Sequence, residues 1–318
     1  MRLILTLLLI STSQAFDLNS WAPLGSDQIN LCWPAVENAN YYEVYAGRTF
    51  QGSYEWSNTV SGNDAIHIRP VLAGREFIYL VAYTADNQVI ETSDTIGCFY
   101  LRNSTFPPGV ERSVPFALGK LEYLDRLSET GCDFSADNST RPSDIIGVQL
   151  ALGAFGNADR VVRQDGGSAA FRTAPNGAWL GTLESGAAMI LGRAYVFATV
   201  QNSHAPIITG RANSNFSPDG MITITGGLAT VSTPIGFPIL DATPVSALGL
   251  ETSGFGRGNP VTGDRLMEQG TGRLAILTPQ GQWRGTLDYC YPERAYFITN
   301  RPHSNGTWVY HLNSVGLP

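Results

Sequence analysis

Short runs of alternating apolar and polar residues occupy the N-terminal third of the chain and predict β-strands. Ile29–Trp33 alternates, Tyr41–Ala46 alternates again, and Glu76–Thr84 forms a longer run of the same kind. Turn-forming residues such as Ser61–Asp64 separate these runs. Roughly seven short strands fit into this length, so we predict a two-sheet β-sandwich over residues 16–102.

The rest of the chain contains one pattern of strands and turns twice. Ala158–Leu183 and Gly263–Leu287 both end in Gly-Thr-Leu, and each then reaches an aromatic strand. The spacing is far longer than the roughly 20–50-residue period of solenoids and propellers, which indicates two copies of a small β-rich domain. The aligned residues are Asp159/Asp264, Arg160/Arg265, Gln164/Gln269, Gly177/Gly281, Trp179/Trp283 and Tyr195/Tyr296.

These patterns predict an all-β fold. The β-sandwich is followed by a stiff linker that contains Pro107 and Pro108, and then by the two duplicated small domains. A short helical element is expected after the first strand of each copy, at Leu121–Leu127 and at Val245–Leu250. The predicted boundaries are 1–15 for a signal peptide, 16–102 for the sandwich, 103–114 for the linker, 115–232 for copy one and 233–318 for copy two.

The N-terminus has the features of a secretory signal peptide. Arg2 precedes the apolar run Leu3–Ile10, and Ser13-Gln14-Ala15 forms a small-x-small cleavage site. The run is too short for a membrane span, which needs roughly 20 apolar residues. We therefore expect cleavage after Ala15, no transmembrane segment after cleavage, and a product that is secreted, periplasmic or peripherally held at the cell surface.

Charge narrows the class of partner. Removing Arg2 with the signal leaves 19 basic side chains against 27 acidic ones, a net charge of −8. Such a surface repels nucleic acid and anionic membranes. The expected partner is therefore a protein or a glycan, and not a nucleic acid.

The first unit resembles a fibronectin type III domain. The resemblance lies in Leu31-x-Trp33-Pro34, in Tyr42-x-Val44-Tyr45, in Val71-x-x-Gly74-x-Glu76-Phe77 and in the strand Tyr79–Tyr83. It implies that Leu31 and Trp33 face the core and that Cys32 between them faces outward. The duplicated portion is similar to β-rich modules found in tandem in secreted bacterial surface proteins, and that resemblance implies an architecture without implying an activity.

Four cysteines in an exported chain are candidates for disulfides. They are Cys32, Cys98, Cys132 and Cys290, and four cysteines allow three pairings. Cys32 and Cys98 are neighbours by location, whereas the outward orientation implied for Cys32 argues against that pair. The pairing stays open. No C-x-x-C spacing is present, which argues against structural zinc and thioredoxin-like redox sites.

Three tryptophans are candidate ligand-stacking residues. Trp179 and Trp283 occupy the same place in the two copies, where each could stack on a sugar or anchor the core of its domain. Trp56 lies between polar residues and is the better candidate for an exposed aromatic side chain.

Catalytic constellations are weak. Glycosidases need two carboxylates roughly 5–9.5 Å apart. Asp159 and Asp264 recur in the two copies, and Glu184/Asp288 is the other position that is acidic in both. Turn capping and framework ion pairs explain this duplication as well. We identify no catalytic, cofactor-binding or metal-binding residues, and we expect no cofactor and no enzymatic activity.

The leading hypothesis is a non-catalytic exported surface or extracellular modular protein acting in binding, adhesion or scaffolding. One alternative is a carbohydrate-active or carbohydrate-binding protein in which the sandwich is an accessory domain. Another is a structural component of the cell envelope, which would be distinguished by self-assembly.

Overall fold

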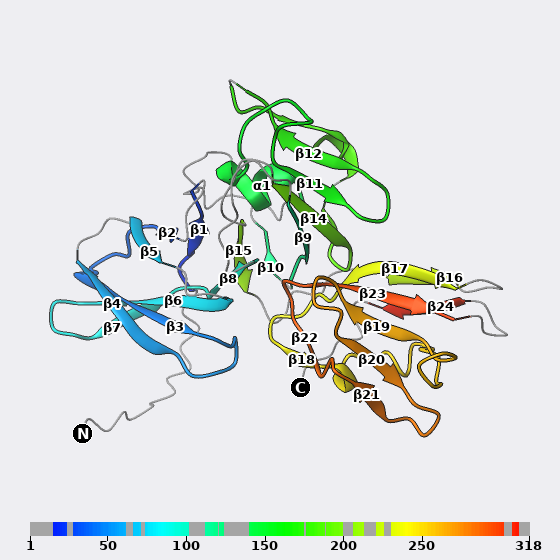
Figure 1. Cartoon of the computed structure of the whole chain (residues 1–318). Coiled ribbons are helices and arrows are strands. Elements are labelled where there is room, and N and C mark those ends of the chain that lie inside the picture. The colour runs from blue at the N-terminus through cyan, green and yellow to red at the C-terminus, as the bar shows by residue number, and fades with distance from the viewer. Residues whose placement is uncertain are drawn as a thin grey trace.

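The computed structural model describes residues 15–23, 28–61, 66–70, 74–101, 112–119, 121–123, 140–174, 176–187, 189–199, 206–212, 221–225, 230–301 and 307–311. The predicted signal peptide before Ala15, most of the predicted linker and Cys132 lie outside these ranges. The chain is all-β, as predicted, and its strands form three lobes (Figure 1).

The first lobe is a sandwich of two antiparallel sheets. One sheet has the order β1 (Asn19–Trp21), β2 (Gln28–Cys32) and β5 (Ile66–Pro70). The other contains β4 (Glu55–Ser61), β3 (Tyr41–Gly47), β6 (Arg75–Tyr83) and β8 (Ile96–Tyr100), with β7 (Val89–Thr92) also paired to β6.

Alternate side chains of these strands form the core of the sandwich. Tyr42 and Val44 of β3 and Ile78 and Leu80 of β6 are fully buried, and Trp33 packs against Tyr42 with ring centroids 5.2 Å apart. The period of two that the sequence shows therefore separates the inner from the outer face of this sheet, as the predicted sandwich requires.

Two strands from the predicted range of copy one extend the second sheet of the sandwich. β15 (Ile207–Ala212) pairs with β8, and β10 (Leu121–Glu122) pairs with β15. Leu121 therefore begins a strand and not the predicted helix. On the outer face of this sheet, Phe77 and Phe99 enter a core that also contains Phe116 of copy one. The first unit and the first module thus share one hydrophobic core.

The two modules, which carry the repeated sequence, have the same strand order. In module one it is β13 (Trp179–Leu180), β12 (Ala169–Arg172), β11 (Arg160–Arg163), β14 (Ala194–Thr199) and β9 (Arg112–Ala117). In module two it is β21 (Trp283–Gly285), β20 (Leu274–Leu277), β19 (Arg265–Glu268), β23 (Ala295–Asn300) and β17 (Val231–Gly236). β9 begins at Arg112, so the last residues of the predicted linker belong to this sheet.

Short elements complete the fold. Helical turns are α1 (Pro142–Ile146), η1 (Gly147–Gln149), η2 (Leu183–Ala187) and η3 (Val245–Ala247), the last of which begins where a helical element was expected in copy two. Two small ribbons pair β18 (Thr243–Pro244) with β22 (Tyr289–Cys290) and β16 (Met221–Thr225) with β24 (Thr307–His311).

The repeated Gly-Thr-Leu motif has a steric cause. Gly181 and Gly285 have φ angles of +118° and +140°, and a side chain at either position would overlap a backbone oxygen of the neighbouring strand. Only glycine tolerates this backbone conformation without strain. Leu183 and Leu287 then point into the cores of their modules. The motif is therefore a framework feature of each copy.

The two modules pack on each other with local twofold symmetry. The side-chain amides of Gln164 and Gln269, which are aligned in the repeat, exchange two hydrogen bonds of 2.9 and 3.0 Å. Each amide also donates to the carbonyl of a tyrosine in its own module, Tyr195 or Tyr296, at 3.3 Å in both.

Backbone contacts repeat the same symmetry. The amide of Gly236 donates to the carbonyl of Gly192 at 3.0 Å, and the amide of Ala117 donates to the carbonyl of Glu293 at 3.4 Å. Ala117 lies opposite the first residue of β14, and Gly236 lies opposite the first residue of β23. Module two therefore donates and module one accepts in the first bond, and the roles are reversed in the second. This reciprocity is the pattern of a twofold interface.

Candidate functional site

A cavity lies at the end of the sandwich where β3 turns into β4. Its volume is about 320 Å³, at the small end of the range for ligand sites. Trp56 and Glu55 of β4, Arg48 of the connecting loop and Glu76 of β6 line it, together with the hydroxyl residues Thr49, Ser53 and Ser57.

The loop between β3 and β4 folds back over the sheet and shapes this cavity. Gly47 makes that possible, because a side chain there would meet the Ser53 carbonyl oxygen at 2.8 Å. The Tyr54 hydroxyl donates to the Phe50 carbonyl at 3.0 Å. The Phe50 amide in turn lies 3.0 and 2.9 Å from the two carboxylate oxygens of Asp241 in module two. Module two therefore helps to hold the loop.

Trp56 is the most exposed aromatic residue of the first unit that the structure describes. Its exposed fraction is 58 %, although an indole is normally among the most buried side chains. It lies directly opposite Tyr45 of β3, next to an irregularity in strand pairing between Val44 and Tyr45. The polar neighbours of Trp56 in the sequence had indicated this exposure.

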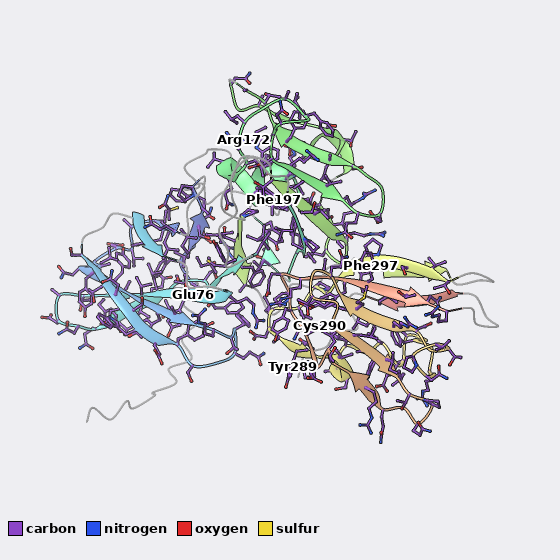
Figure 2. All side chains as sticks on the ribbon, in the orientation of Figure 1. Glu76, Arg172, Phe197, Tyr289, Cys290 and Phe297 are labelled. Carbon is purple, nitrogen blue, oxygen red and sulfur yellow. The ribbon has the colours of Figure 1, made fainter. Side chains whose placement is uncertain are left out.

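The charged residues that line the cavity differ in their exposure to solvent. Glu55 is exposed, whereas Glu76 is 2 % exposed on β6 (Figure 2). The Arg48 guanidinium donates to the Arg75 carbonyl at 3.2 Å. The exposed charged groups of the lining, Glu55 and Arg48, have opposite signs, so their charges balance at the surface of the cavity. Sequence reasoning missed Arg48 and Glu76, since only the strand register brings them to Trp56.

Tyrosines cover the outer face of the sheet beside the cavity. Tyr41 stacks on Tyr83 with centroids 5.0 Å apart, and Tyr45 stacks on Tyr79 at 5.2 Å, in both cases across neighbouring strands. Burial raises the pKa of Tyr79 above its ordinary value. Because these rings pack on one another, they stabilise the sheet and leave the Trp56 ring as the available platform.

Trp179 and Trp283 lie elsewhere. Both are half-buried and pack against the cores of their own modules. The Trp283 ring lies 5.2 Å from the Phe255 ring, and its Nε1 donates to a Glu251 carboxylate oxygen at 2.6 Å. Neither tryptophan lines the cavity, and their positions fit the anchoring alternative.

The repeated aspartates are buried and bind backbone amides. Asp264 accepts from the amides of Gly256 at 2.7 Å and Arg301 at 2.8 Å, and Asp159 accepts from Ala151 at 3.1 Å. In each module the aspartate lies eight residues after a loop residue whose backbone amide donates to it, Ala151 for Asp159 and Gly256 for Asp264. These contacts are those of a framework carboxylate.

Glu184 also has a structural contact. Its carboxylate accepts from the amide of Ser143 at 3.0 Å and from the hydroxyl of Ser143 at 2.7 Å, in the first turn of α1. It lies in the helical turn η2. Asp288 lies between β21 and β22.

The described cysteines are thiols, and the predicted disulfides are not found among them. Cys32, Cys98 and Cys290 are all buried. Ile29, Leu31 and Trp33 all lie in the core of the sandwich, so the alternation continues through Trp33. Cys32 between them is also buried. Burial raises the pKa of the Cys290 thiol far above its ordinary value (Figure 2 shows its place in module two).

Within the described ranges, no group of three or more His, Cys, Asp or Glu side chains is arranged to hold a metal ion. The helices that the structure describes are all too short or too polar to cross a membrane.

Comparison with known proteins gives distant likenesses to solved structures. No protein-family model matches the chain, and no curated protein is significantly similar to it in sequence. Among solved structures, pectate lyase Pel3 from Pectobacterium carotovorum matches at 15 % identity and a TM-score of 0.24, over 35 % of this chain and 32 % of the lyase. The chain therefore spans about a third of that structure. The FN1–FN3 domains of chicken CNTN1 match at 10 % identity and a TM-score of 0.21, over 92 % of this chain and 96 % of the fragment.

Proposed function

We propose that the chain is a non-catalytic, exported binding protein whose ligand is a carbohydrate. The observation that carries the proposal is Trp56, an indole that is 58 % exposed at a cavity of about 320 Å³. An exposed aromatic face beside hydroxyl and carboxylate groups suits a sugar ring, which has an apolar face and a rim of hydroxyls. The two modules serve as a rigid support for the first unit, and the likeness of that unit to fibronectin type III domains fits a role in adhesion.

The charge of the lining narrows the ligand class. The exposed lining charges, Glu55 and Arg48, balance each other, so a neutral sugar is favoured. The net negative charge of the whole chain disfavours polyuronates and tolerates amino sugars. A secreted or peripherally held location, after removal of residues 1–15, would expose the site to extracellular glycans.

The experiment is a titration of the mature chain with neutral oligosaccharides, amino-sugar oligosaccharides and polygalacturonate by isothermal calorimetry. Wild type should bind a neutral or amino sugar, and Trp56→Ala should weaken that binding at least tenfold. Trp56→Phe should retain part of it, because a smaller ring still offers a face. Val89→Ala is the matched control, since Val89 is equally exposed on β7 and lies away from the cavity lining. Equal binding by wild type and Trp56→Ala would refute the proposal.

A second candidate function is hydrolysis of a glycosidic bond. It is favoured by one observation, namely that two carboxylates, those of Glu55 and Glu76, line the same cavity. Reducing-sugar release by wild type that is lost in both Glu55→Gln and Glu76→Gln would support catalysis. Binding without release, retained in Glu55→Gln, would support the non-catalytic function.

A further inference from the structure

In each module a further strand follows the aromatic strand, β15 after β14 and β24 after β23, and the two have different pairing partners. In module one β15 starts 13 residues after the start of β14, and in module two β24 starts 12 residues after the start of β23. The two strands therefore occupy the same place in the duplicated pattern. β15 leaves its own module and pairs with β8 of the first unit along five residues, from Ile207 opposite Tyr100 to Arg211 opposite Ile96. In module one this strand extends the sheet of a neighbouring unit.

Its counterpart β24 joins no larger sheet within the part of the chain that the structure describes. Among the described strands it pairs only with β16, in a two-stranded ribbon. Two strands alone are marginally stable, and three or more are needed for an independent sheet. Outer edges of such a ribbon present backbone amides and carbonyls that favour pairing with another strand.

The first unit offers one long acceptor edge. β4 is the last strand of its sheet, has seven residues, and has exposed side chains everywhere except Val60, which is half-buried. It contains neither lysine nor proline, the residues that commonly protect edges. Its pairing with β3 is regular from Asn58 to Ser61. The other sheet offers less, because β1 has three residues and β5 ends in Pro70.

We propose that β24 of one copy adds to the β4 edge of a second copy. The two strands carry little charge, since Glu55 is the one acidic or basic residue of β4 and Thr307–His311 contains no acidic residue, lysine or arginine. No like charges therefore oppose the pairing. β4 and β24 lie on opposite sides of the molecule, so the partner is a second chain and not the same one (Figure 1).

The contact joins two different surfaces, and repeated contacts of this kind form open chains or rings. It goes beyond the proposed carbohydrate binding, because it uses the backbone of β4 and needs no ligand. It would place many Trp56 cavities along one assembly, and multivalency of this kind strengthens binding to repetitive glycans.

The test combines association measurements with paired edge-blocking variants. One of two adjacent strand amides faces the neighbouring strand and the other the open edge. Asn58→Pro and Thr59→Pro are therefore made separately for β4, and Trp308→Pro and Val309→Pro for β24. The variant of each pair that keeps the wild-type circular dichroism spectrum and melting curve is used.

Sedimentation velocity of the mature wild-type chain should show a mass that increases with protein concentration. The β4-blocked and the β24-blocked variants should each stay monomeric, and an equimolar mixture of the two should form dimers, because one intact edge then meets one intact strand. A monomeric wild type at every concentration, association of the β24-blocked variant alone, or a monomeric mixture would each overturn the proposal.

A second measurement does not depend on any variant folding. A synthetic peptide of residues 306–312, added in excess to wild type, should bind the β4 edge and reduce the average mass to that of the monomer. A scrambled peptide of the same composition is the control. Unchanged assembly with the native peptide would contradict pairing through β24.

Discussion

Replacing Asp264 by asparagine distinguishes a framework carboxylate from a catalytic one. Asp264 is fully buried, and its two carboxylate oxygens accept from two backbone amides at 2.7 and 2.8 Å. Asparagine keeps the shape and one acceptor oxygen, but it places an NH₂ group against the second amide. One charge-assisted hydrogen bond is lost, and a buried donor loses its partner.

The size of the effect follows from these contacts. A hydrogen bond to a charged group contributes about 1.5–3 kcal/mol, and an unsatisfied buried donor costs about 1–3 kcal/mol. The two energies describe partly the same loss and do not simply add, so we expect Asp264→Asn to lower the free energy of unfolding by about 2–4 kcal/mol. With a denaturant slope of about 2 kcal/mol/M, the urea midpoint should fall by about 1–2 M.

The assay is urea unfolding followed by circular dichroism, with Asp86→Asn as the control because Asp86 is exposed in a loop. Asp159→Asn in module one should act in the same direction, since its carboxylate also holds a loop amide. An Asp264→Asn chain with an unchanged midpoint would refute the framework role, above all if ligand binding or turnover were lost at the same time.

Three further predictions concern the repeat and its interface. Gly285→Ala should lower the free energy of unfolding by about 3 kcal/mol or more, because φ is +140° and the new side chain would overlap the backbone, whereas Gly156→Ala, in open space, should change it by less than about 0.5 kcal/mol. Burial raises the pKa of Glu293 above its ordinary 4.5. Its contribution to the free energy of unfolding is therefore greatest below pH 4.5 and falls as the pH rises through the raised pKa. Glu293→Gln should remove this pH dependence of stability in a pH series of melting curves. A double-mutant cycle of Gln164→Ala and Gln269→Ala should give a coupling energy of about 0.5–1.5 kcal/mol, and a coupling near zero would argue against their reciprocal hydrogen bonds.

The duplicated framework was predictable because its determinants are local in the sequence. The Gly-Thr-Leu motif, for example, marks a strand-ending glycine and a buried leucine in each copy, and a motif of this kind can be read without knowing the fold. The exposure of Trp56 was predictable for the same reason, because its polar neighbours already indicate a solvated position.

Long-range pairing was not predictable from local pattern. The sequence of Ile207–Ala212 does not say that this strand leaves its module and joins the first unit. Likewise Glu76 reaches the cavity only through the register of β6 with its neighbours. The burial of Cys32 could not be predicted either, because alternation assigns a residue to a face of its strand without saying whether the rest of the chain covers that face.

The most direct test of the carbohydrate-binding account is ligand protection of Trp56 from chemical oxidation. The mature chain is treated with N-bromosuccinimide, with and without the tightest-binding oligosaccharide, and the oxidised tryptophans are mapped by mass spectrometry. Trp56 should oxidise rapidly in the free protein and be protected by the sugar, while the half-buried Trp179 and Trp283 should react slowly and equally in both samples. Rapid oxidation of Trp56 at saturating sugar would contradict the account.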